Sequence, residues 1–142
     1  MSALCNEKPF MRRLKFGFVF LVLFISCGWS GAEEKPYPTH KQVELTGVVR
    51  EGFGFDANRK REEYFFLRLD KAISVDADQF SDERKGVRDI QLVPLSDVAI
   101  GSFLDKRIAI KGKLFHSFSA HHHKKVLLEV GETNDARAVS KP

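Results

Sequence analysis

The chain has 142 residues, with 23 Lys and Arg against 19 Asp and Glu, and a sequence pI of about 9.1. Four of these basic residues and one acidic residue lie in residues 1–32, so the remainder carries a net charge of only about +1. A domain this close to neutral lacks the positive field that attracts nucleic acid, which argues against a nucleic-acid-binding protein.

The N-terminus has the pattern of a secretory signal. Arg12, Arg13 and Lys15 precede an apolar run at residues 16–25, and small residues follow at 30–32. A membrane-spanning helix needs about 20 apolar residues, so this run is too short to be retained as an anchor. We therefore predict a signal peptide over residues 1–32, an exported periplasmic protein, and no transmembrane helix in the mature chain.

Two alternatives remain open within this segment. Residues 24–27 resemble a bacterial lipobox ending at Cys27, so a lipoprotein anchored through Cys27 is the alternative to cleavage after Ala32. Met11 begins a more ordinary signal than Met1 does and is an alternative start.

Both cysteines of the chain lie within residues 1–32. The exported part therefore has no disulfide and depends on its core, which suits one small single-core domain. Residues 33–42 contain Pro36 and Pro38 and are expected to form a linker. We place the domain at residues 43–133 and a flexible tail at residues 134–142.

The domain has mainly the period-two alternation of β-strands. Glycines at 47, 52 and 54 interrupt the first strand and indicate strong bending. Pro94 limits the third strand to an edge or a strand end, and Ser96 with Asp97 offers an N-cap for a brief helical turn near residues 98–104. The expected strands are 43–55, 63–75, 89–95, 107–118 and 125–130.

This element order is typical of the OB-fold. Three strands, a short helix and two further strands predict a mainly β protein, namely a small five-stranded OB-like Greek-key barrel with its helix between strands three and four. A meander sheet or half sandwich is the main alternative.

The sequence also resembles a known bacterial family. The segment 106–116 (KRIAIKGKLFH), the histidines at 121–123 and the apolar 126–128 are similar to the domain of unknown function 4431. The segments 64–70 and 90–92 also resemble this family, so the resemblance covers roughly residues 43–131. It implies an exported single-domain protein and assigns no activity.

Four of the five histidines lie between residues 116 and 123. On a strand, His121 and His123 would share one face, and His116 across the hairpin could supply a third nitrogen. Zinc or copper would suit such a set, so one hypothesis is a periplasmic metal-binding protein with these three ligands. The spacing matches no recognised zinc motif, and a solvated polar hairpin tip is the more ordinary interpretation.

A second hypothesis uses the loops that bind ligands in OB-folds, which join strands one to two and four to five. These loops would form a basic, histidine-bearing rim. Phe53 and Phe55 lie beside it and could stack ligands, although we favour a core position for both. The candidate rim residues are Arg59, Lys60, Arg61, His122 and Lys124.

Catalytic motifs are not recognisable in the expected mature chain, which lacks a thiol, a nucleophile elbow and a phosphate-binding loop. An enzyme with a histidine acid or base is therefore the weakest hypothesis. The acidic segment 76–87 does not fit an EF-hand, because Ser81 stands where glycine is needed, and we expect a solvated loop. The preferred function is a non-catalytic exported binding module whose rim binds or inhibits another protein or binds a small ligand.

Overall fold

The computed structural model describes residues 34–96, 98–132 and 135–140. It confirms a mainly β protein, with one six-stranded sheet and the short 3-10 helix η1 (Ile100–Phe103). The predicted signal segment and Cys27 lie outside the described residues. Within the described residues, no helix is long and apolar enough to cross a membrane.

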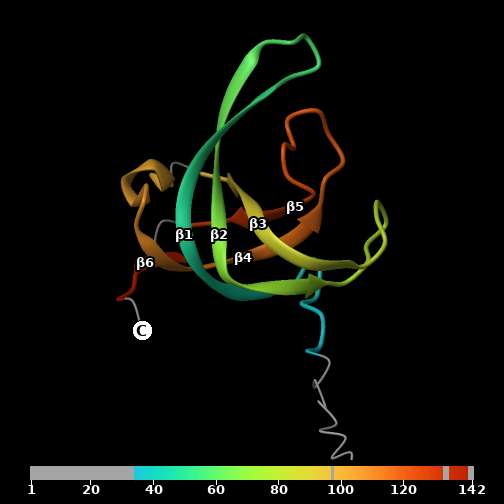
Figure 1. The fold of residues 1–142 in the computed structure, drawn as a ribbon, viewed down its shortest axis with the longest axis vertical. Helices are drawn as coiled ribbons and strands as arrows, with labels where there is room; N and C mark the ends of the chain where they lie inside the picture. The colour runs from blue at the N-terminus through green and yellow to red at the C-terminus, as the bar shows by residue number, and fades with distance from the viewer. Residues whose placement is uncertain (1–33, 97, 133–134, 141–142) are drawn as a thin grey trace, which may run out of the picture. The chain divides into compact units, whose positions relative to one another are not determined.

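Figure 1 shows the strands wrapped around one another, with the β1–β2 hairpin extending beyond the rest. Most strand bounds lie within two residues of those predicted from the alternation. The elements are β1 (Gln42–Phe55), β2 (Arg61–Val75), β3 (Arg84–Pro94), η1 (Ile100–Phe103), β4 (Arg107–His116), β5 (Val126–Val130) and β6 (Ala136–Ala138).

The strands follow the order β1-β2-β3-β5-β4-β6, and β1 also pairs with β4. All pairings are antiparallel except that of β3 with β5, which is parallel. β1 changes partner along its length, because residues 42–48 pair with β4 and residues 47–55 pair with β2. The predicted bend of the first strand therefore has a structural role.

Gly47 lies at this change of partner, opposite both Leu69 and Ile108. A Cβ atom at this position would stand 2.3 Å from the carbonyl oxygen of Arg68. Only glycine allows the backbones to approach this closely.

The core lies inside the curve of the sheet and contains aliphatic side chains from β1 to β5. Two polar residues, Gln91 and His116, are also buried. The core side chains with no exposed surface are Val49, Leu67, Val75, Ile90, Ile108, Ile110, Leu114, Val126, Leu128 and Val130.

Three local features differ from the sequence expectations. β3 begins at Arg84, inside the expected loop, because its first residues are charged and solvent-facing and carry no alternation. Ala136–Ala138 pairs with β4, so this part of the expected tail is a strand. The helix is capped by Ala99 without a side-chain hydrogen bond, and Ser96 instead donates to the carbonyl of Gly131.

Candidate functional site

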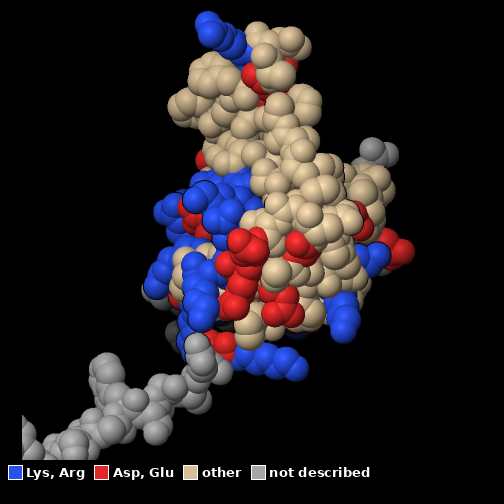
Figure 2. Space-filling model, turned by 90° about the vertical axis from the view of Figure 1, so that its right-hand side faces the viewer, with Lys and Arg blue, Asp and Glu red and all other residues tan. Residues whose placement is uncertain are grey.

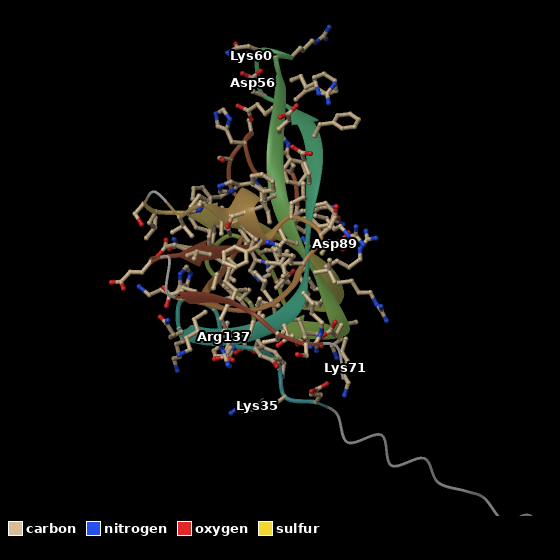
Figure 3. The ribbon with its side chains drawn as sticks, turned by 90° about the vertical axis from the view of Figure 1, so that its left-hand side faces the viewer. Lys35, Asp56, Lys60, Lys71, Asp89 and Arg137 are labelled. Atoms are coloured by element: carbon tan, nitrogen blue, oxygen red, sulfur yellow. The ribbon has the colours of Figure 1, made fainter. Side chains whose placement is uncertain are left out.

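The tip of the β1–β2 hairpin is a compact turn held by Asp56. Its Oδ1 accepts hydrogen bonds from the backbone N–H groups of Asn58 and Lys60, each at 2.8 Å. Arg59 has a left-handed backbone, with φ of 61°. Figure 3 shows Asp56 and Lys60 at the far end of the hairpin. The predicted cations Arg59, Lys60 and Arg61 therefore stand on an ordered, exposed tip.

Phe53 and Phe55 are solvent-exposed, which makes the favoured core position wrong. Their exposed fractions are 61% and 59%. They continue the strand face that buries Val49, but the hairpin has by then left the core, so this face meets solvent. The Arg61 guanidinium lies 4.7 Å from the centroid of the Phe53 ring, a cation–π contact. We call Phe53, Phe55, Arg59, Lys60 and Arg61 the hairpin rim.

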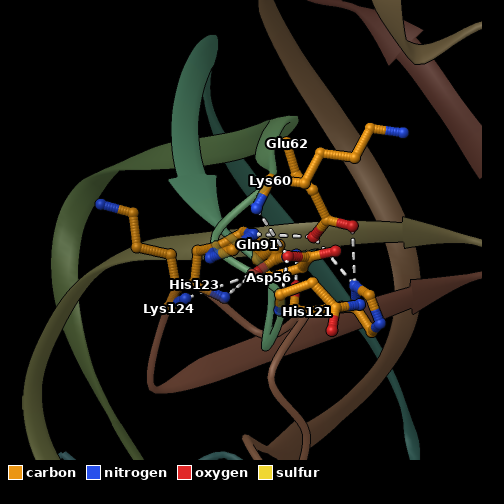
Figure 4. Close-up of polar contacts among 8 residues, drawn as sticks. Asp56, Lys60, Glu62, Gln91, His121, His123 and Lys124 are labelled. Atoms are coloured by element: carbon orange, nitrogen blue, oxygen red, sulfur yellow. Dashed lines mark hydrogen bonds and ion pairs between the residues drawn. The ribbon is translucent and has the colours of Figure 1, made fainter.

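On the opposite face of the hairpin, the carboxylate of Glu62 contacts two histidines of the β4–β5 loop. His121 Nδ1 lies 2.8 and 2.9 Å from the two carboxylate oxygens of Glu62, and His123 Nε2 lies 3.3 Å from one of them. Both imidazole N–H groups donate to the carboxylate (Figure 4). The predicted proximity of the two loops is therefore present, and Glu62 is the residue that joins them.

This contact shifts the protonation of both partners. The hydrogen bond to Glu62, followed by the charge of the carboxylate, raises the pKa of His121 above its usual value. The hydrogen bond from His121 lowers the pKa of Glu62 below its usual value. His121 is 65% exposed, so solvent screens the pair and its free energy is small.

His123 is packed much more tightly than His121. Its ring stacks on Tyr64 with centroids 4.8 Å apart, and only 10% of its side chain is exposed. A Cβ atom on Gly54 would lie 2.2 Å from His123 Nδ1. Glycine at this position of β1 therefore makes room for the imidazole against the hairpin backbone.

Gln91 fixes the backbone of the same loop from beneath. Its side-chain amide donates to the carbonyl of His121 at 3.0 Å and accepts from the N–H groups of His123 and Lys124 at 2.6 and 3.2 Å. Gln91 is buried, so these hydrogen bonds take the place of those that water would make with its amide and with the backbone groups of the loop. Sequence reasoning missed Gln91, although a lone amide between Ile90 and Leu92 was a visible signal.

The side chain of Lys124, a predicted rim residue, lies over the sheet and is not part of the hairpin rim. Its ammonium lies 3.3 Å from Asp89 Oδ2 and 4.4 Å from the centroid of the Phe66 ring. Asp89 also accepts two hydrogen bonds from Arg68. The bond from Arg68, and then that from Lys124, lowers the pKa of Asp89. Lys124 is thus engaged within the protein.

His122 points to a different, aromatic cluster. Its Nδ1 accepts a hydrogen bond from the backbone of Phe118 at 3.1 Å, and its ring packs edge-on against Phe118 and Phe115. Burial lowers the pKa of His122. Phe80 of the β2–β3 loop stacks on Phe118 at 4.9 Å. Figure 2 shows uncharged surface running from the hairpin down one part of the molecule, with Lys and Arg gathered beside it and Asp and Glu below.

His116 is separated from the other histidines. It is buried beneath the β2–β3 loop, where Nε2 donates to the carbonyl of Asp76 at 2.8 Å and its backbone N–H donates to Asp78 at 3.0 Å. The structure does not bring together the three predicted ligands His116, His121 and His123. Across the described ranges, no group of three or more His, Cys, Asp or Glu side chains is placed to hold a metal ion.

Asp78 anchors the acidic loop, which is therefore not wholly solvated. Burial raises the pKa of this carboxyl, but hydrogen bonds from the backbone of His116, Phe80 and Ser81 outweigh burial and leave the pKa below its usual value. The carboxylate is a structural acceptor, and no calcium site is needed to explain it.

Residues 89–134 match the family described as Domain of unknown function (DUF4431). The match confirms the resemblance over most of β3, the helix, β4 and β5. It includes Gln91 and the β4–β5 loop with its histidines at 121–123, which we call the histidine loop. No curated protein and no solved structure matches the chain.

Proposed function

We propose that this protein is an exported, non-catalytic binding module that contacts another protein through the hairpin rim. The observation that carries the proposal is the exposure of Phe53 and Phe55 beside three cations on an ordered turn. Large exposed aromatic side chains next to Arg are the residues that most often provide binding energy at protein interfaces.

We further propose that the sheet is an OB-like barrel. The pairings from β1 through β2, β3, β5 and β4 return to β1, and the short helix lies between β3 and β4. Ligands of OB-folds bind on the strand two to three face between the two flanking loops. Here the β4–β5 loop lies on that face and buries Phe66 and Gln91. This supports the hairpin rim, which remains exposed, as the contact surface.

Export rests on the sequence of residues 1–32. We propose cleavage after Ala32, with lipidation of Cys27 as the alternative. Mass spectrometry of the protein from its native host distinguishes a chain that begins at residue 33, a lipidated Cys27, and an unprocessed chain. The unprocessed chain would contradict export.

The hairpin rim is tested by site-specific photo-crosslinking in the native host. A photoreactive residue at Phe55 should give a discrete protein adduct, and the same residue at the exposed Lys113 of β4 is the matched control. The adduct should disappear when Arg59 and Lys60 are both changed to Glu, because the charge of the rim is reversed. Equal adducts from positions 55 and 113, or an adduct that survives the charge reversal, would contradict the proposal.

A further inference from the structure

The two longest strands separate at the end of the molecule opposite to the hairpin tip. β1 and β2 are in register only from Gly47 with Leu69 to Phe55 with Arg61. Before this point β1 pairs with β4, whereas β2 continues beside β3. Residues 42–46 and 70–73 therefore have no ladder between them, and we call the space between them the strand split.

A cavity of about 680 Å³ occupies the strand split, which is within the usual range for ligand sites. Both strands line it. Its apolar wall contains Leu45, Leu69, Ile73 and Tyr37, and the first three belong to the buried core.

Within the described residues, the β1 edge of the split carries backbone hydrogen-bonding groups without a partner strand. Val49 exchanges hydrogen bonds with residues 105 and 106, on the β4 side. The backbone N–H and C=O groups of successive strand residues point to opposite edges. Because those of Val49 point towards β4, those of Thr46 and Glu44 point into the split. The register of β1 with β4 is regular over residues 42–48, so this alternation holds along the β1 edge, and Thr46 and Glu44 both line the cavity.

The edge of β2 already accepts an extended segment next to the split. Tyr37 forms a parallel bridge with Val75, in which its N–H donates to Ser74 at 2.8 Å and its carbonyl accepts from Asp76 at 2.9 Å. Glu34 and Pro36, which precede Tyr37, line a second cavity together with Ala72 and Ser74, so the open edge at the split is that of β1. An open strand edge is a template for pairing with another chain.

The charge at the split favours an acidic occupant. Asp70 pairs with Arg107 at 2.6 Å, Glu44 pairs with Arg137 at 2.9 Å, and Asp105 pairs with Arg50. Lys71 also lines the cavity, and in the described part of the chain its ammonium has no partner. Figure 3 shows Lys71 at the end remote from Lys60.

We propose that the strand split binds an extended peptide segment of a partner protein by strand addition, with apolar side chains in the cavity and an Asp or Glu side chain at Lys71. Main-chain hydrogen bonds provide affinity in this mode of recognition, and pockets for alternate side chains provide specificity. This site is separate from the hairpin rim and does not depend on it.

The test selects random seven-residue peptides displayed on phage against the full chain. Enriched peptides should alternate apolar residues and contain Asp or Glu. The corresponding synthetic peptides should bind roughly tenfold more weakly to Thr46→Pro, which removes one N–H group at the split, and several-fold more weakly to Lys71→Glu. The matched control Lys113→Glu, on an exposed position of β4 outside the cavity, should bind as the unchanged chain does.

Alternate N-methylation of the peptide provides a readout that needs no folded variant. It removes half of the peptide's N–H donors and should abolish binding to the unchanged chain. The proposal is overturned if no peptide is enriched, if methylated peptides bind equally, or if folded Thr46→Pro and Lys71→Glu retain full affinity. Binding lost only on changing Phe53 and Phe55 to Ser also overturns it, and would support the hairpin rim instead.

Discussion

The two faces of the β1–β2 hairpin have opposite surroundings. One face carries Gly54, Glu62 and Tyr64 and is covered by the histidine loop. The other carries Phe53 and Phe55 and is bare. On β1, glycine thus marks the covered face and phenylalanine the exposed one, the reverse of the pattern expected for a stability-driven hairpin. This contrast separates side chains that hold the loop from side chains available to a partner.

The largest expected effect on the covered face comes from Gln91→Leu. It removes three hydrogen bonds and leaves the N–H groups of His123 and Lys124 without their acceptor. Because each unsatisfied buried group costs about 1–3 kcal/mol, we expect the free energy of unfolding to fall by roughly 3 kcal/mol. Urea unfolding measures it, and a loss below about 1 kcal/mol would show that the loop is not held through this amide.

A smaller effect is expected from Gly54→Ala. The new methyl group occupies the position of the His123 ring, so the ring must leave its stack on Tyr64. We expect a loss of about 1–2 kcal/mol from this overpacking. The NMR signals of His123 should shift as the stack is lost. An unchanged His123 spectrum would show that the hairpin and the loop are not in contact here.

The Glu62–His121 pair predicts a pH dependence. The raised pKa of His121 gives stability that is complete below its ordinary value of 6.5 and is lost as pH rises through the folded value. The lowered pKa of Glu62 gives stability that is present above 4.5 and is lost as pH falls. The contact should therefore be strongest between these two values. NMR titration should show the His121 pKa returning towards 6.5 in Glu62→Gln, and an unchanged titration would contradict the contact.

The smallest effect on stability is expected on the bare face. Changing Phe53 and Phe55 together to Ser should alter the free energy of unfolding by less than about 0.5 kcal/mol per site, as for other surface positions. Thermal unfolding monitored by circular dichroism measures it. A loss as large as that of Gly54→Ala would show that the phenylalanines pack against something in the folded protein, and would remove the argument for the hairpin rim.

The strands could be predicted from the sequence because their apolar residues alternate, as in β2 and β4. The location of the candidate site could be predicted only in part. Phe53 has the correct alternation for burial, but alternation does not reveal where a strand leaves the core. The separation of His116 from His121 and the role of Glu62 depend on register between distant strands, which one sequence does not contain. The charged start of β3 at Arg84 does not alternate in hydrophobicity, and Ala136–Ala138 has only three residues, too few to show a period, so neither segment gave a strand signal.

The double pairing of β1 has a kinetic consequence. The first half of β1 pairs with β4, and β3 pairs in parallel with β5. Both partners are distant in the sequence, so the sheet cannot be completed from neighbouring segments. Folding dominated by such non-local pairs is slow, in the range of milliseconds to seconds, because the entropy of large loops is lost before the contacts form. Until β4 pairs with it, β1 is a long, glycine-interrupted strand with an open edge, whereas the close approach that Gly47 allows is to Arg68 of β2 within the hairpin.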